Sequence, residues 1–272
     1  MKRVLLLAFS IAWAGSIAVD AEAQHFDVFV AEDAGKVAIG GYSFDDDVIA
    51  NSQIFEAELE ADAGQYAGIE PGFVSGDPDP ASMPSGWTPL ASSPSILLGF
   101  DVNTTLGRNL LFWDAVGGTV GDVEFGAVAD GEILAITQTG CFVCDSITVD
   151  GGTSPVLGFV LDDTANPVHD HPEFQLFGDA SVTPDTVTPG IYLLNLKVTV
   201  TDLADADPTW ILFAAFDPAD YPELDEEQFD AFIEGQNALA AEWVAANVPE
   251  PGTVLLLGGG VAALAARHRR RE

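Results

Sequence analysis

The side chains best suited to chemistry are a few histidines and acids that recur at a spacing of two residues. His169, His171 and Glu173 follow the pattern i, i+2, i+4, which puts all three on one face of an extended segment. His25 and Asp27 repeat this spacing near the N-terminus. Imidazole and carboxylate groups are typical ligands of zinc, manganese and copper. We therefore predict that a first strand carrying His25 and Asp27 meets the second segment, and that the two share one divalent metal ion.

Two other interpretations of these residues stay open. Pro172 interrupts the second segment, and pairs of histidines are also common in surface loops that hold no ion. Asp162, Asp163 and Asp170 offer an oxygen-rich set that would suit calcium. The sequence thus leaves zinc, manganese, copper and calcium as candidate ions.

The two cysteines of the chain, Cys141 and Cys144, are predicted to form a local disulfide. In a protein exported to an oxidising compartment, two cysteines this close in sequence usually form a disulfide. A thioredoxin-like redox pair would open a helix, whereas residues 145–150 alternate as a strand does. Two cysteines alone do not complete a tetrahedral zinc site.

The sequence contains no familiar signature of a catalytic site, and we expect a non-enzymatic protein. It lacks a Gly-x-Ser-x-Gly elbow, a phosphate loop, a dinucleotide fingerprint and a His-Glu-x-x-His helix. The alternative is a secreted sandwich that binds or cleaves carbohydrate. In that case Trp87, Trp113 and Trp210 would line a sugar groove, although each is also a natural core residue.

The elements that must position these residues are predicted to be strands. Alternation is clearest from Ile191 to Thr201, where Tyr192, Leu194 and Leu196 face one way, which predicts a half-buried strand. Phe55, Ala57 and Leu59 alternate with glutamates in the same manner. Further strands are expected at 26–30, 37–44, 96–102, 110–113, 123–128, 133–138, 156–161, 174–177 and 210–216. Residues 71–94, rich in Pro, Gly and Ser, are predicted to form a long surface excursion.

One amphipathic helix is predicted near the end of this region. Asp225 is placed to cap it, Gln228 completes a capping box, and apolar residues from Phe229 to Val244 recur on one face. The predicted fold is therefore all-β: an antiparallel, jelly-roll-like β-sandwich over residues 24–223 with a packed amphipathic helix over 224–247.

The region between residues 24 and 247 is strongly acidic. It contains 39 Asp and Glu but only three cations, Lys36, Arg108 and Lys197, which gives a formal charge of −36. Such a field repels phosphates and anionic lipid surfaces, which excludes nucleic acid as an electrostatic partner. It suits either solubility in salty water or the binding of divalent cations.

Both ends of the chain carry targeting patterns. Lys2 and Arg3, the apolar run from Val4 to Val19 and Ala21-Glu-Ala23 predict a signal peptide over residues 1–23. At the other end, Pro249-Glu250-Pro251 precedes a run of 14 uncharged residues from Thr253 to Ala266, and Arg267, Arg269, Arg270 and Arg271 follow this run. Positive charges stay on the cytoplasmic side of a membrane helix, which would leave Pro249 to Pro251 outside.

This tail, residues 248–272, resembles the PEP-CTERM sorting signal of Gram-negative-type bacteria. The resemblance implies a short transmembrane sorting helix and an exosortase that recognises the Pro-Glu-Pro motif. It also implies an exported protein with an inner-membrane intermediate, which then reaches the cell surface or the extracellular matrix. Exopolysaccharide is the partner expected there.

Overall fold

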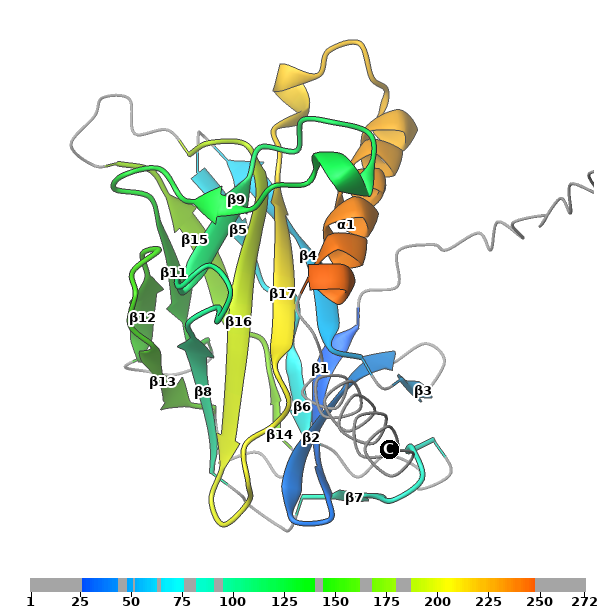
Figure 1. Ribbon diagram of the computed structural model, residues 1–272, viewed down its shortest axis with the longest axis vertical. Helices are drawn as coiled ribbons and strands as arrows, with labels where there is room; N and C mark the ends of the chain where they lie inside the picture. The colour runs from blue at the N-terminus through cyan, green and yellow to red at the C-terminus, as the bar shows by residue number, and fades with distance from the viewer. Residues whose placement is uncertain are drawn as a thin grey trace, which may run out of the picture.

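The computed structural model describes residues 26–43, 48–50, 52–62, 65–75, 82–90, 95–139, 144–161, 168–179 and 187–247. These residues form two sheets and one C-terminal helix (Figure 1), so the mostly β, sandwich-like fold with a late helix is confirmed. The predicted signal peptide and the predicted sorting helix lie outside the described residues. Within the described part, no helix is both long and apolar enough to span a membrane.

The smaller sheet contains the first strands of the chain. Its order is β14 (Val168–Asp170), β6 (Phe73–Ser75), β1 (Asp27–Asp33), β2 (Lys36–Ser43) and β3 (Val48–Ala50), and β7 (Trp87–Pro89) also pairs with β1. Ala34 and Gly35, with φ of 50° and 86°, make the two-residue turn that joins β1 to β2. The sheet places β1 and β14 on the two sides of β6.

The larger sheet carries most of the core. Its order is β10 (Gly126–Ala127), β9 (Leu110–Trp113), β16 (Gly190–Val200), β17 (Thr209–Ala215), β4 (Ile54–Asp62), β5 (Gln65–Gly68), β15 (Glu173–Phe177), β11 (Ile133–Thr137) and β12 (Ser146–Val149), with β8 (Ile96–Asp101) and β13 (Val156–Val160) attached through β16. The prediction of a purely antiparallel fold is wrong in two places, because β17 pairs with β4, and β1 with β6, in parallel.

The main hydrophobic core lies between these strands. Val28 and Ile39 of the smaller sheet belong to the same buried cluster as Leu98 and Phe213 of the larger one. The rings of Phe174 on β15 and Phe213 on β17 lie 4.8 Å apart, which links two strands of the curled larger sheet. Phe55, Ala57 and Leu59 point into this core as predicted, with at most 2% of each exposed.

Helix α1 (Glu226–Asn247) covers the other side of β16 and β17. Asp225 accepts from the backbone N–H of Gln228, and the Gln228 side chain accepts from that of Asp225, so the predicted capping box is confirmed. Phe229, Ile233 and Val244 share a second buried cluster with Trp113, Ile191, Leu193, Trp210 and Leu212. Because of this cover, the strand predicted to be half-buried is buried on both faces from Gly190 to Leu196.

Residues 71–94 correct a second prediction. We expected a surface excursion, but β6 is buried throughout and lies inside the smaller sheet, between β14 and β1. Only three residues, Phe73 to Ser75, form this strand, which is too short for alternation to reveal. The position of β6 between these two strands is what brings β1 within reach of β14.

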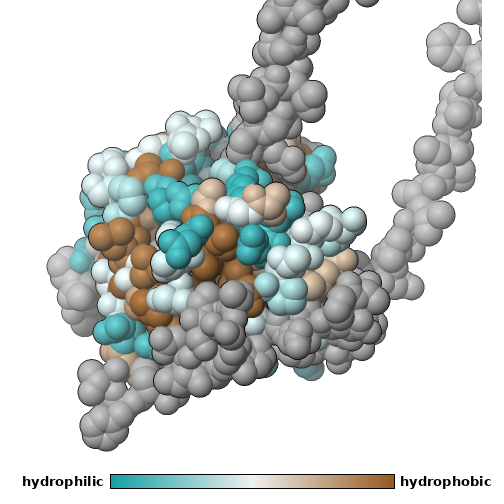
Figure 2. All heavy atoms as spheres, turned by 90° about the horizontal axis from the view of Figure 1, so that it is seen from below, coloured by the Kyte–Doolittle hydropathy of each residue, from teal (hydrophilic) through white to brown (hydrophobic). Residues whose placement is uncertain are grey.

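Two of the three cations fix the turns at one end of the domain. Lys36 Nζ lies 2.6 Å from Asp207, and Lys197 Nζ lies 3.7 Å from Asp101 and 3.8 Å from Asp205. The backbone N–H of Val37 also donates to Ala204. The surface at this end of the domain shows a group of hydrophobic residues with hydrophilic residues lying among them (Figure 2).

Candidate metal centre

The candidate site forms where β1 begins and β14 ends. Asp27 is the first residue of β1, and His169 lies on β14 opposite Val74 of β6. His171 follows directly after β14, before the chain continues into β15 of the larger sheet. Asp27, His169 and His171 each offer one ligand atom, and these atoms lie within 4.8 Å of one another. The predicted meeting of the first strand with the 169–173 segment is therefore observed.

The three ligand atoms form a compact triangle. The Nε2 atoms of His169 and His171 lie 2.8 Å apart, and Asp27 Oδ2 lies 3.6 Å and 3.8 Å from them. A circle through three such atoms has a radius of about 2.0 Å, close to the roughly 2.0–2.2 Å of zinc bonds to imidazole nitrogen and carboxylate oxygen. One ion can therefore contact all three atoms without a change in their positions.

The Asp27 carboxylate is buried and oriented. Only 4% of the residue is exposed. Its Oδ1 accepts from the backbone N–H of Gly72 at 2.9 Å, whereas its Oδ2 is buried and has no hydrogen-bond partner among the described residues. A buried carboxylate oxygen without a donor is costly unless a cation compensates it. This oxygen is the one that faces the two histidines.

Gly72 leaves the space that the site occupies. A Cβ atom at this position would lie 2.5 Å from His171 Cε1 and 2.7 Å from Asp27 Oδ1. Both distances are shorter than real Cβ contacts allow. The missing side chain therefore lets the β6 backbone approach both ligands.

The loop before β6 also surrounds the other ring nitrogen of His171. Its Nδ1 lies 3.3 Å from the carbonyl of Ile69 and 3.6 Å from a carboxylate oxygen of Glu70. Thr139 Oγ1 donates to the His171 carbonyl at 2.8 Å. A carbonyl that accepts from Nδ1–H keeps the lone pair on Nε2, the nitrogen that faces Asp27, as outer contacts of metal-bound histidines do.

At neutral pH, the surroundings of Asp27 and His169 favour the protonation states in which these side chains can bind a metal ion. Burial raises the pKa of Asp27 to about 6, an increase that His171 opposes and Glu70 supports. Burial, and then the neighbouring His171, lower the pKa of His169 below its usual value. At pH 7 the carboxylate is therefore mostly ionised and the His169 imidazole mostly neutral.

The other predicted ligands are not part of this cluster. Glu173 is exposed on β15, where it pairs with Thr137 of β11 in the larger sheet. Asp170 lies between the two histidines but is buried, as the alternation of β14 requires. His25, Asp162 and Asp163 lie outside the described residues. Sequence analysis missed the contributions of Ile69, Glu70 and Gly72, which no local pattern connects to His171.

The remaining candidate residues have other surroundings. Cys144 is disulfide-bonded, and Cys141 lies outside the described residues. Trp113 and Trp210 are 2% and 4% exposed beneath α1, so their ring faces are not available to a sugar. Trp87 is partly buried against the smaller sheet.

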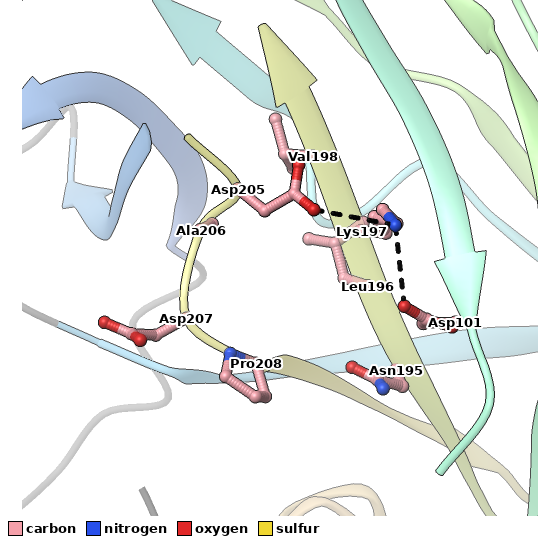
Figure 3. Close-up of a pocket in the computed structure, with 9 residues that line it drawn as sticks. All are labelled: Asp101, Asn195, Leu196, Lys197, Val198, Asp205, Ala206, Asp207 and Pro208. Carbon is pink, nitrogen blue, oxygen red and sulfur yellow. Dashed lines mark ion pairs between the residues drawn. The ribbon is translucent and has the colours of Figure 1, made fainter. Parts of the chain in front are cut away.

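A small pocket lies beside the second half of β16, next to the loop that leads into β17. Lys197 lies between Asp101 and Asp205 on one wall, and Asn195, Asp207 and Pro208 line the rest (Figure 3). Lys197 is already paired with both acids. Both ion pairs are largely exposed, and they leave no unpaired cation in this pocket to bind a ligand.

Comparison with known proteins identifies the tail of the chain. Residues 247–271 match the family model of the PEP-CTERM protein-sorting motif. No curated protein and no solved structure matches the chain. The chain thus carries a PEP-CTERM sorting signal. It is an exported protein that an exosortase sorts to the cell surface or the extracellular space.

Proposed function

We propose that this protein is a non-enzymatic surface or matrix protein whose β-sandwich binds one divalent transition metal ion through Asp27, His169 and His171. The observation that carries the proposal is the triangle of ligand atoms, in which a buried carboxylate oxygen without a hydrogen-bond donor faces two imidazole nitrogens. The ion would satisfy that oxygen and hold the start of β1 to the end of β14.

Two imidazole ligands favour zinc or copper over calcium. Calcium prefers six to eight oxygen ligands, and the described cluster offers only one carboxylate beside the two imidazoles. Imidazole suits zinc and copper, and a site with nitrogen ligands at these separations suits zinc geometry.

The metal content of the purified full chain tests the proposal. Wild-type protein prepared without chelators is expected to bind one zinc ion per chain in equilibrium dialysis. Asp27→Asn and His171→Ala should each weaken binding at least tenfold. Glu173→Gln is the matched control, because this acid is close in sequence but belongs to the other sheet. Equal binding by wild type and Asp27→Asn, or no stoichiometric binding by wild type, would overturn the proposal.

We further propose that the protein passes through an inner-membrane intermediate before the exosortase acts. The apolar run from Thr253 to Ala266 and the four arginines behind it support this route. A topology reporter placed after Asn247 should be active only outside the cytoplasm. Activity on the cytoplasmic side would contradict the route.

A further inference from the structure

We infer that the ion at Asp27, His169 and His171 keeps one coordination position that faces solvent, and that a small donor from outside the chain can bind there in place of water. This inference rests on the metal site proposed above. It names a ligand class for that site: a small anion, such as a single carboxylate or azide.

The triangle of ligand atoms leaves one side of the ion open. Its sides are 2.8 Å, 3.6 Å and 3.8 Å, so an ion bonded to all three atoms at about 2.05 Å lies within about 0.5 Å of their plane. Zinc in proteins is almost always four-coordinate, and a zinc site with three protein ligands takes water or another small donor as its fourth ligand.

The described residues supply three ligands and not a fourth. The cluster of groups able to hold an ion contains Asp27, His169 and His171. Glu70 is the nearby acid: it interacts with Asp27, accepts from the same Gly72 N–H and contacts Nδ1 of His171 rather than Nε2. It is not among the groups whose ligand atoms gather at the site.

The exposure of the ligands shows which side of the site is open. The exposed fraction of the side chain rises from 6% for Asp27 to 29% for His171 and 47% for His169. Gly72 and the β6 backbone close the buried side against Asp27 and His171. A fourth ligand would thus approach from the side of the histidines, where water has access.

The charge on the ion and its direct ligands indicates the class of the fourth ligand. A divalent ion, the Asp27 carboxylate and two neutral imidazoles together carry +1, so the ion can still bind an anionic donor, and Glu70 beside His171 balances this charge in the surroundings. The region between residues 24 and 247 carries −36 as a whole before the ion is bound, and it repels large polyanions. A small anion can reach the ion, whereas a phosphate polymer is disfavoured.

Cobalt(II) in place of zinc makes the fourth position visible. Four-coordinate cobalt absorbs strongly in the visible range and six-coordinate cobalt only weakly, so the spectrum reports the coordination number. With one cobalt bound to the full chain, we expect the strong absorption and a saturable shift of its bands when azide is added. Cobalt content is measured again after dialysis, to show that azide binds to the ion and does not remove it.

Each result of this experiment either supports the open coordination position or refutes it. If cobalt does not bind to wild type, the metal site itself is refuted. If cobalt binds but gives the weak six-coordinate spectrum, or a strong spectrum that azide does not change, the site stands and the open position is refuted. If only His25→Ala responds to azide, His25 occupies the position in wild type and the inference is again wrong. Equal responses of wild type and His25→Ala support it.

Discussion

At the scale of single residues, the account depends on close contacts around one buried acid. The spacing of His25, Asp27, His169 and His171 predicted that distant segments would meet, and Asp27, His169 and His171 do. Glu173 was predicted to join them and does not, since the chain passes to the other sheet after Pro172. The roles of Ile69, Glu70 and Gly72 could not be predicted, because Gly72 and Asp27 are 45 residues apart and meet only through sheet pairing.

Substitution of Gly72 tests these contacts. Gly72→Ala would place a Cβ 2.5 Å from His171 and 2.7 Å from Asp27, so the two ligands must separate. We expect at least tenfold weaker zinc binding in dialysis, together with a loss of about 1–3 kcal/mol of stability from overpacking. Gly126→Ala is the matched control, because its Cβ meets nothing within 4 Å. Unchanged zinc affinity in Gly72→Ala would contradict the site geometry.

A second buried polar group lies away from the metal centre. The hydroxyl of Tyr192 lies 2.7 Å from the Thr188 carbonyl and 3.1 Å from a carboxylate oxygen of Glu132, which is 3% exposed. The single hydroxyl proton serves one of these two acceptors, so Tyr192→Phe leaves the Thr188 carbonyl or Glu132 Oε2 without it, while Glu132 Oε1 keeps its hydrogen bonds from Thr188. Urea unfolding should show a loss of about 1–3 kcal/mol. Tyr221→Phe, at the partly exposed ring packed near α1, should change stability by much less; equal effects of the two variants would refute this role.

At the scale of elements, alternation predicted the long strands well and missed several of the short ones, although the four-residue β9 lies where it was expected, at 110–113. β4, β11, β15 and β17 were predicted within a residue or two, because their side chains are sorted by burial. The short buried β6 carries too few residues for a pattern. The burial of Leu193 on the outer face of β16 could not be read from that strand, since it depends on where α1 packs.

The packing of α1 on the larger sheet gives an element-scale prediction. Ile233 is 4% exposed against the cluster that holds Leu212 and Trp210. Ile233→Ala should destabilise the domain by about 2–5 kcal/mol, as other large-to-small core changes do. The exposed Asp230→Ala on the same helix should remain within about 0.5 kcal/mol of wild type. Similar unfolding midpoints for both variants would show that α1 is not part of the core.

At the scale of the whole molecule, net charge and targeting act together. The exported region carries −36, and its lysines are already paired with acids. Self-repulsion of this size opposes the compact state, and salt screens it. The free energy of unfolding in urea should therefore rise as ionic strength increases from about 0.01 M to 0.15 M, where the Debye length falls from about 30 Å to 8 Å. A decrease over this range would contradict the argument.

The C-terminal sorting signal was the part of the molecule that the sequence revealed most directly, because it is a linear pattern that needs no tertiary contact, whereas the signal peptide over residues 1–23 stays a prediction. The PEP-CTERM match at residues 247–271 confirms the tail. It says where the protein is sorted, whereas the metal centre depends on contacts between distant segments. The two therefore need separate tests.

The most direct test of the central claim is anomalous diffraction from crystals of the protein grown with zinc, measured at the zinc absorption edge. We predict one strong peak within about 2.0–2.2 Å of Asp27 Oδ2, His169 Nε2 and His171 Nε2 together. A map with no peak at these atoms, or with zinc bound only by other residues, would contradict the account.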